Sequence, residues 1–433
     1  MTSAVPEGPP PVPLGRLRQP GASAALHHEL RRTHGPVAPV LLDDGVPAWL
    51  VLGYRELHQV TADPQLFSRD PGLWNRPGTI PDGWPLPPDV GRDAPSAPPA
   101  SGAGAAHPHP PAPHTTVLHT TGPRHTERAA VIAHALTAQG PYRLREHAER
   151  FADALVDGFC TRGGADVIGQ YAVPLPVRVL ARLFGFAESS APELEAALNA
   201  VAGGREGAVD GRRRLTAAVG ELVAERRREP GEDVASRMLA DPAGPSEEEI
   251  ARDLTLMLIA GHRPTTDWIG NSLRLMLTDE RFAASLSGGR RSVVEAMNEV
   301  LWEDPPAQNV PGRWAARDTV LGGRHIRAGD LVVLGLAAAN SDPEVRADRA
   351  ALTGGNNAFF SFGHGEHRCP FPAREIAEVV ARAGVEVLLD RLPDLDLDLA
   401  PQELARRPSP WLRGVSRLPV RFTPAAAIGP RRR

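Results

Sequence analysis

The residues most capable of chemistry lie in one segment, FSFGHGEHRCPFPARE, which precedes an expected helix beginning near Pro372. Gly363 and Gly365, two residues apart, allow the backbone to fold tightly against a flat ligand. Cys369 ends this loop, where the N–H groups and the dipole of the following helix would stabilise a thiolate. A thiolate in this position could bind a metal ion. The alternative for Cys369, taken alone, is an ordinary small buried residue.

With Phe362, Gly363, Gly365, His367 and Cys369 all in place, the segment resembles the haem-binding loop FGxGxHxC of the cytochrome P450 family. The resemblance implies that Cys369 is the axial ligand of the iron in haem b, iron protoporphyrin IX. Thiolate ligation favours cleavage of the O–O bond of dioxygen. The resemblance further implies that Phe362 packs beside the ligand and that His367 lies near a haem propionate.

Other segments follow in the family's order, and the resemblance extends over about residues 25 to 425. The sequence LMLIAGHRPTTDWIGNSLRLML resembles the long helix across the distal face of the haem, where Ala260 and Gly261 would leave room for iron and oxygen. NEVLWEDPPAQNVPGRWA resembles the helix and strand that come next, with Arg313 at a position that binds a propionate by a charge-assisted hydrogen bond. GPRHTERAAV resembles the helix that supplies His125 and Arg128 to the propionates, three residues apart on roughly one helical face. The alternative for this pair is a solvated helix face.

The ExxR pair of the family is incomplete. Glu299 is present, but Trp302 occupies the arginine position. An indole has one N–H donor and cannot form a two-pronged contact with a carboxylate. Arg349 matches the third member of this group, so we expect it to pair with Glu299. Some actinobacterial members, including a group encoded beside signalling operons with a small GTPase, show such a replacement, which adds signalling proteins to the candidate partners.

The distal helix departs from the family at the oxygen groove. Arg263 and Pro264 occupy the positions where most members have an acid followed by an alcohol. An arginine gives up no proton at neutral pH, and a proline is expected to kink the helix because it lacks an N–H. Four residues from Gly261, Thr265 is the predicted substitute alcohol for catalysis, with Thr266 second. The alternative is a hydroxyl bonded back to a helical carbonyl.

The periodicity predicts a mainly α protein with small β-sheets, and the resemblance implies the cytochrome P450 fold. Residues 1–20 are predicted to be a flexible tail, residues 21–425 a single domain, and residues 426–433 a second tail. Within the domain, residues 71–113 form a long Pro-, Ala-, Gly- and His-rich loop, where a wall of the substrate entrance is expected. Amphipathic stretches predict helices near 22–33, 123–138, 143–161, 173–184, 190–201, 211–228, 247–278 and 373–392.

The composition excludes some classes of protein. Lys plus Arg number 48 against 52 Asp plus Glu, and a formal net charge of −4 argues against a nucleic-acid partner. Cys160 and Cys369 match no zinc or disulfide spacing, which fits a reducing cytoplasm. Neither a signal peptide nor an apolar run of membrane-spanning length is visible, so we expect a cytoplasmic protein without membrane insertion.

The expected function is a haem-thiolate monooxygenase that inserts one oxygen atom of O2 into an unknown small organic substrate. Its electrons would come from a ferredoxin and a ferredoxin reductase. Two alternatives remain because the acid, the alcohol and the ExxR arginine are missing. One is a haem-binding sensor or scaffold protein with weak oxygen activation, and the other is a peroxide-driven oxygenase.

Overall fold

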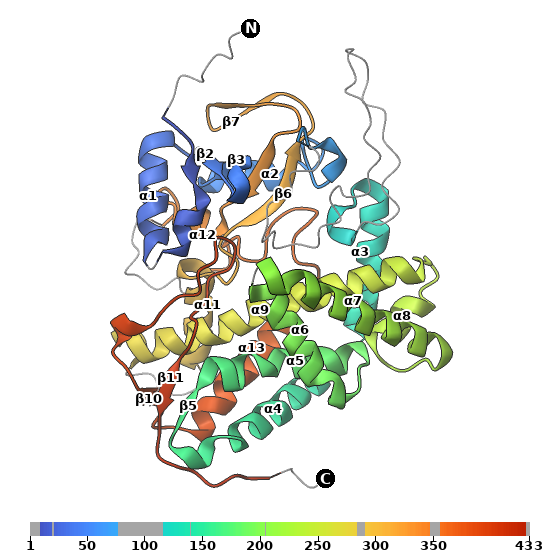
Figure 1. Ribbon diagram of the computed structural model, residues 1–433, viewed down its shortest axis with the longest axis vertical. Coiled ribbons are helices and arrows are strands. Elements are labelled where there is room, and N and C mark those ends of the chain that lie inside the picture. Colours follow the sequence, from blue (N-terminus) through green and yellow to red (C-terminus); the bar gives the residue numbers. More distant parts are fainter. Residues whose placement is uncertain are drawn as a thin grey trace.

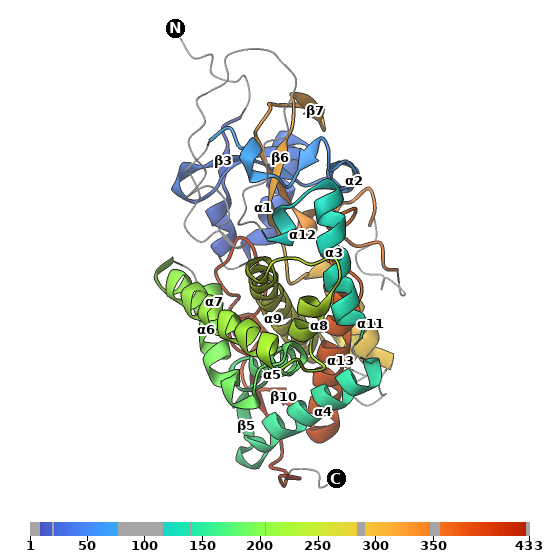
Figure 2. The ribbon, with the colours of Figure 1, turned by 90° about the vertical axis from the view of Figure 1, so that its right-hand side faces the viewer.

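The computed structural model describes residues 9–19, 21–76, 116–138, 140–203, 205–283, 291–346 and 356–429. Its helices form the larger part of the molecule, and most of its strands gather with α1 and α2 at one end (Figures 1 and 2). The predicted class, mainly α with small sheets, is confirmed. Within the described ranges, no helix is both long and apolar enough to span a bilayer.

The helices follow the amphipathic stretches closely, although the short α2, α8, α10 and α12 were not predicted from periodicity. Their bounds are α1 Ala22–His34, α2 Tyr54–Ala62, α3 Gly122–Thr137, α4 Pro141–Asp157, α5 Pro174–Phe184, α6 Ala191–Gly203, α7 Arg205–Arg228, α8 Val234–Ala240, α9 Glu247–Thr278, α10 Glu280–Ala283, α11 Arg291–Glu303, α12 Leu336–Asn340 and α13 Ala373–Arg391.

Three small sheets accompany the helices, with strand orders β1-β2-β3-β9-β6-β4, β10-β11-β5 and β7-β8. The strands are β1 Val12–Pro13, β2 Val37–Leu41, β3 Pro47–Val51, β4 Phe67–Ser68, β5 Gly164–Asp166, β6 Val310–Ala315, β7 Thr319–Leu321, β8 Arg324–Ile326, β9 Leu331–Leu334, β10 Asp396–Leu397 and β11 Pro419–Arg421. In the largest sheet, β4 pairs antiparallel with β6 and thereby brings two distant parts of the chain to the edge of the site described below.

Helix α9 is the long element that crosses the molecule (Figure 1). It begins with a capping box, in which the Ser246 hydroxyl accepts from the Glu249 N–H and the Glu249 carboxylate accepts from the Ser246 N–H. Its bounds agree with the predicted 247–278. The helical assignment runs through Pro264 without interruption, so the proline does not end the helix.

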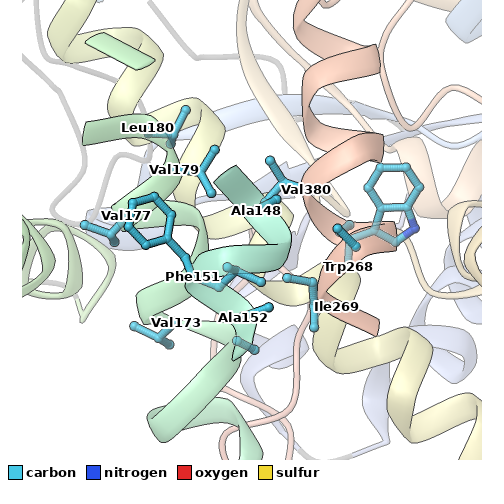
Figure 3. Close-up of a cluster of buried hydrophobic side chains, with 14 of the residues drawn as sticks. Ala148, Phe151, Ala152, Val173, Val177, Val179, Leu180, Trp268, Ile269 and Val380 are labelled. Atoms are coloured by element: carbon cyan, nitrogen blue, oxygen red, sulfur yellow. The ribbon is translucent and has the colours of Figure 1, made fainter. Parts of the chain in front are cut away.

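The largest apolar core lies among α4, α5, α9 and α13. Figure 3 shows Ala148, Phe151 and Ala152 of α4 close to Val177 of α5 and Ile269 of α9. Helix α13 packs against both α4 and α9. Because α13 directly follows the Cys369 loop, this packing fixes where the loop meets the body of the protein.

The predicted tails are shorter than expected. Leu14 and Leu17 are buried, and Val12–Pro13 pairs with β2, so the packed domain already includes residues that were assigned to the flexible tail. At the other end, the N–H groups of Ile428 and Gly429 donate to Asp157 at 3.1 and 2.9 Å. Most of the predicted 71–113 loop lies outside the described residues.

Candidate active site

The loop between Phe359 and Pro372 folds back on itself before α13. Gly363 and Gly365 adopt φ values of 72° and 74°, in the left-handed region that glycine tolerates best. A Cβ on Gly365 would stand 2.0 Å from the carbonyl oxygen of Thr61, so only glycine lets the loop approach the end of α2 this closely. The Cys369 N–H donates to the Phe362 carbonyl at 2.8 Å, which closes the loop around the cysteine.

The Cys369 side chain lines an internal cavity, and its thiol is not activated by the protein alone. Burial raises the pKa of Cys369 to about 12, Glu375 raises it further and Arg374 opposes both. Desolvation therefore disfavours the thiolate while no cation is bound, and stabilisation of a thiolate by the helix dipole and nearby N–H groups stays a prediction. A thiolate at this position requires a bound cation, and a metal ion coordinated by the sulfur would supply one.

The cavity has a volume of about 800 Å³ and lies between the cysteine loop and α9. Ala260, Gly261 and Thr265 of α9 line it, together with Phe362 and Cys369, so the structure brings the predicted distal and proximal residues to one space. Away from the loop, the wall is apolar and is formed by Ile132, Leu136, Leu180, Leu183, Phe184, Leu256 and Met257.

One end of the cavity is cationic. Arg313, His125 and His367 all line it, as predicted, and Arg69 joins them. Arg313 is 1% exposed and donates from Nη1 to the Phe67 carbonyl at 2.8 Å. Burial lowers its pKa to about 10, although Glu366 partly opposes the shift.

The two histidines of this cationic end stack on one another, with ring centroids 4.0 Å apart. His367 Nε2 lies 2.9 Å from the Thr120 carbonyl, and its Nδ1 has no hydrogen-bond partner among the described residues. Burial, with Arg69, His125 and Arg313, lowers the pKa of His367 to about 2. His367 is therefore neutral at physiological pH, and its single N–H is donated from Nε2 to the Thr120 carbonyl.

Arg128 does not line the cavity, contrary to the prediction. Its Nε and Nη2 donate to the Asp253 carboxylate at 3.1 and 2.7 Å, and Glu249 lies 3.5 Å from Nη1. Burial raises the pKa of Asp253 to about 6, while Arg128 lowers it. The side chain three residues after His125 therefore turns toward α9 and joins α3 to that helix.

Arg69 was missed because no sequence motif marks it. It follows β4 and lies more than fifty residues before His125, so only tertiary structure brings it to the cavity. The pairing of β4 with β6 places Arg69 at the cavity. Both strands are short and far apart in the chain, so their register cannot be predicted from the sequence.

The two threonines of α9 take different positions. Thr265 lines the cavity, and its hydroxyl donates to the Gly261 carbonyl at 2.7 Å. The alternative of a hydroxyl bonded back to the helix is therefore observed, while the side chain also lies at the cavity wall. Its role as the substitute alcohol stays a prediction. Thr266 is fully buried, donates to the His262 carbonyl at 3.1 Å and does not line the cavity, so its candidacy as second alcohol is not supported.

Pro264 also lines the cavity, while Arg263 turns away from it. Arg263 Nε lies 3.4 Å from Asp267 Oδ1, one turn further along α9, and Arg407 lies 2.6 Å from Oδ2. Burial raises the pKa of Asp267 to about 7, Arg263 opposes the shift and Asp304 adds to it. The cavity wall at the helix centre therefore has a proline ring where an alcohol was expected.

The incomplete ExxR group is replaced by other contacts. Glu299 forms a buried ion pair with Arg346, and Arg281 Nη1 lies 4.0 Å away. Arg349, the partner proposed from sequence, lies outside the described residues. Trp302 is buried, and its indole N–H donates to the Asn356 carbonyl at 2.9 Å.

Solved structures with this fold include that of cytochrome P450 CYP109Q5 from Chondromyces apiculatus, with a TM-score of 0.76, 28% identity, and coverage of 96% of this chain and 99% of that one. No family model matches the chain. Cytochrome P450 monooxygenase PikC of Streptomyces venezuelae is 29% identical over 434 residues, covering 98% of this chain and 97% of its own. Vitamin D(3) 25-hydroxylase of Pseudonocardia autotrophica is 29% identical over 407 residues, covering 92% and 93%.

Over nearly its whole length the chain is similar to bacterial cytochrome P450 proteins in sequence, and it shares their fold. The similarity implies an oxidoreductase with a haem-thiolate cofactor.

The residues present fit such a cofactor. A cysteine sulfur at one wall can ligate iron, and two buried guanidinium groups at the cavity edge, Arg69 and Arg313, retain Nε atoms without hydrogen-bond partners among the described residues. Buried cations of this kind are suited to carboxylates.

Proposed function

We propose that the chain is a monooxygenase that inserts one oxygen atom of O2 into an organic substrate. Cys369 would hold the iron of haem b, with Phe362 packed beside the sulfur and Gly363 and Gly365 giving the loop its close approach. The haem, when bound, supplies the iron centre at which dioxygen is activated. The coincidence of the cysteine loop with the cationic cavity edge is the observation that carries this proposal.

The chain's own residues would orient the cofactor and the substrate. Arg313 is suited to a propionate because its guanidinium lines the cationic end of the cavity. His367 lines the same end and stacks on His125, and it would donate to a propionate from Nδ1 once that nitrogen binds a proton, which a nearby carboxylate favours. On the opposite wall, the small residues Ala260 and Gly261 leave space between α9 and the position proposed for the haem. The Thr265 hydroxyl, already bonded to a carbonyl, is the chain's candidate for holding a proton-carrying water at the cavity wall.

The substrate we propose is an apolar organic molecule. Leucine, methionine and phenylalanine side chains dominate the wall away from the loop, and they favour burial of apolar surface. One relative is a vitamin D(3) 25-hydroxylase, which is consistent with such a substrate class.

The electrons would come from a ferredoxin and its reductase. Arg368 and Phe371 are both exposed beside Cys369, and a cationic and an aromatic group on one surface suit an acidic protein partner. The cytoplasm is the compartment we propose, because Cys160 and Cys369 are both free thiols.

The absorption spectrum of the reduced protein with carbon monoxide tests the ligand assignment. We expect a strongly red-shifted Soret band in the wild-type protein, and its complete loss in Cys369→Ala. Cys160→Ala is the matched control, because Cys160 is buried in the main core and remote in sequence from the loop. An unchanged spectrum in Cys369→Ala would refute the assignment of the ligand.

One observation favours a different function. Pro264 and Arg263 leave the centre of α9 without the acid and alcohol that relay protons. This suits a haem-binding sensor or scaffold that works beside signalling partners, or a peroxide-driven oxygenase. Oxygen consumption with product analysis separates these. Steady product formation supports the monooxygenase, and release of only peroxide supports the sensor or scaffold. Product formed from added peroxide without any reductase supports the peroxide-driven oxygenase.

A further inference from the structure

Two arginines stand opposite one another across a strand pair at the edge of the cavity. In the β4–β6 ladder, Phe67 is opposite Ala315 and Ser68 is opposite Trp314. Continuing the antiparallel register by one residue places Arg69 opposite Arg313. Their side chains are 3% and 1% exposed, so both guanidinium groups are withdrawn from water.

Neither guanidinium is held by a direct ion pair with a described residue, although Glu366 acts on Arg313 from a longer distance. Arg69 Nη1 donates to the Pro311 and Gly312 carbonyls at 2.9 and 3.3 Å, and Arg313 donates to the Phe67 carbonyl. Within the described ranges, no carboxylate forms an ion pair with either arginine. Burial and the neighbouring Arg313 lower the pKa of Arg69 well below its usual value.

Such an arrangement costs stability unless an anion is present. Like charges directly opposite in a strand pair repel, and desolvation adds to the cost of each buried guanidinium. His119 lies beside Arg69, where its Nδ1 faces the Arg69 carbonyl, and as a neutral ring it adds no negative charge. The pair is therefore arranged for a ligand with at least one carboxylate, and Arg69 lines the cavity where that ligand would lie.

We propose that Arg69 is a cofactor-binding residue that, together with Arg313, holds the carboxylates of haem. This inference rests on the proposed function, since haem supplies the carboxylates. The inference adds Arg69, which follows β4 and belongs to no motif, to the cationic end of the cavity. Arg128, which was predicted there, instead forms an ion pair with Asp253.

The competing role for Arg69 is structural. Its Nη1 holds the Pro311 and Gly312 carbonyls, and Gly312 has a φ of 94° that needs support from its surroundings. The two roles predict opposite effects on the haem-free protein. Removing a structural tether destabilises it, whereas removing one of two repelling cations leaves it equally stable or more stable.

The test compares Arg69→Gln and Arg69→Lys with the wild-type chain, with Arg313→Gln as a positive control and Arg417→Gln, at an exposed site, as a negative control. Two quantities are measured: the rate at which haem leaves the loaded protein for excess apomyoglobin, and the thermal midpoint of the haem-free protein. We expect Arg69→Gln to release haem roughly tenfold faster or more, because a charge-assisted hydrogen bond is lost. Its haem-free midpoint should be unchanged or higher, and Arg69→Lys should release haem at an intermediate rate.

Two results would overturn the inference. One is haem release from Arg69→Gln at the wild-type rate, and the other is a lowered haem-free midpoint that accounts for faster release. Failure of haem binding, the part of the proposed function on which the inference rests, is distinguishable from both, because in that case the wild-type chain itself would bind no haem. A chain that binds haem but forms no product would fail as a monooxygenase and leave the result for Arg69 unaffected.

Discussion

Pro264 places a ring at the centre of the cavity wall, where a hydroxyl would be able to hold water. We expect Pro264→Thr to raise the rate of product formation by roughly tenfold or more, because positioned proton transfer is typically worth at least a hundredfold in rate. Product and consumed O2 are measured with a substrate that the wild-type chain oxidises.

Pro264→Ala is the matched control for this change, because it restores the backbone N–H without adding a hydroxyl. Equal effects of Thr and Ala would assign the gain to the helix backbone, and no gain in either would place the proton source elsewhere. Arg263 is left unchanged, since a glutamate there would face the Asp267 carboxylate one helical turn away.

Helix α11 joins the main core to the cysteine loop through Trp302. Its indole N–H holds the Asn356 carbonyl, and its ring meets Phe359 edge-on at 5.9 Å between centroids. Arg374 lies over both Phe359 and Phe362, so the ring contacts continue to the residue whose carbonyl accepts the Cys369 N–H. The element therefore supports the loop by packing and by one hydrogen bond.

Trp302→Phe keeps an aromatic ring but leaves the Asn356 carbonyl without its donor, so we expect it to lower the free energy of unfolding by about 1 to 2 kcal/mol. Trp302→Ala also removes the ring and should cost about 3 to 5 kcal/mol. Urea unfolding of the haem-free protein measures both, with Val294→Ala as the control at an exposed site of the same helix. Equal losses in the two Trp302 variants would show that the ring contact carries no stability.

Buried histidines make the stability of the whole molecule depend on pH. Burial lowers the pKa of His119 to about 4 and that of His262 to about 3, with Arg69 and Arg263 adding to the respective shifts. The unfolded chain binds protons at these residues below its ordinary histidine pKa of about 6.5, whereas the folded chain does not. Stability is therefore fully present above about pH 6.5 and is lost as the pH falls toward 4.

We expect His262→Gln to reduce this dependence by roughly 1 kcal/mol per pH unit between pH 5 and 6, because one differential proton is removed. The free energy of unfolding in urea, measured at several pH values, gives the slope. His134→Gln, at an exposed histidine, should leave the slope unchanged. A slope of wild-type size in His262→Gln would show that His262 takes up a proton in the folded state.

Much of the fold could be predicted because it is encoded locally. The periodicity of apolar residues predicted a helix at 247–278, and these are the observed bounds of α9. The spacing of Gly363, Gly365 and Cys369 indicated a tight cysteine loop, because close backbone approach demands glycine. Such patterns involve residues that are close in sequence, so they can be recognised without knowing how the rest of the chain folds.

The sequence by itself thus indicated the cytochrome P450 fold, the cysteine loop and most of the helices. Only the tertiary structure decided the charges around the site: Arg128 binds Asp253, Arg346 binds Glu299, and Arg313 lies close enough to Arg69 to lower its pKa. It also decided the burial of the Cys369 sulfur, which raises the pKa of the thiol. These properties depend on burial and on side chains from segments far apart in the chain, and desolvation is a property of the packed molecule that no local pattern contains.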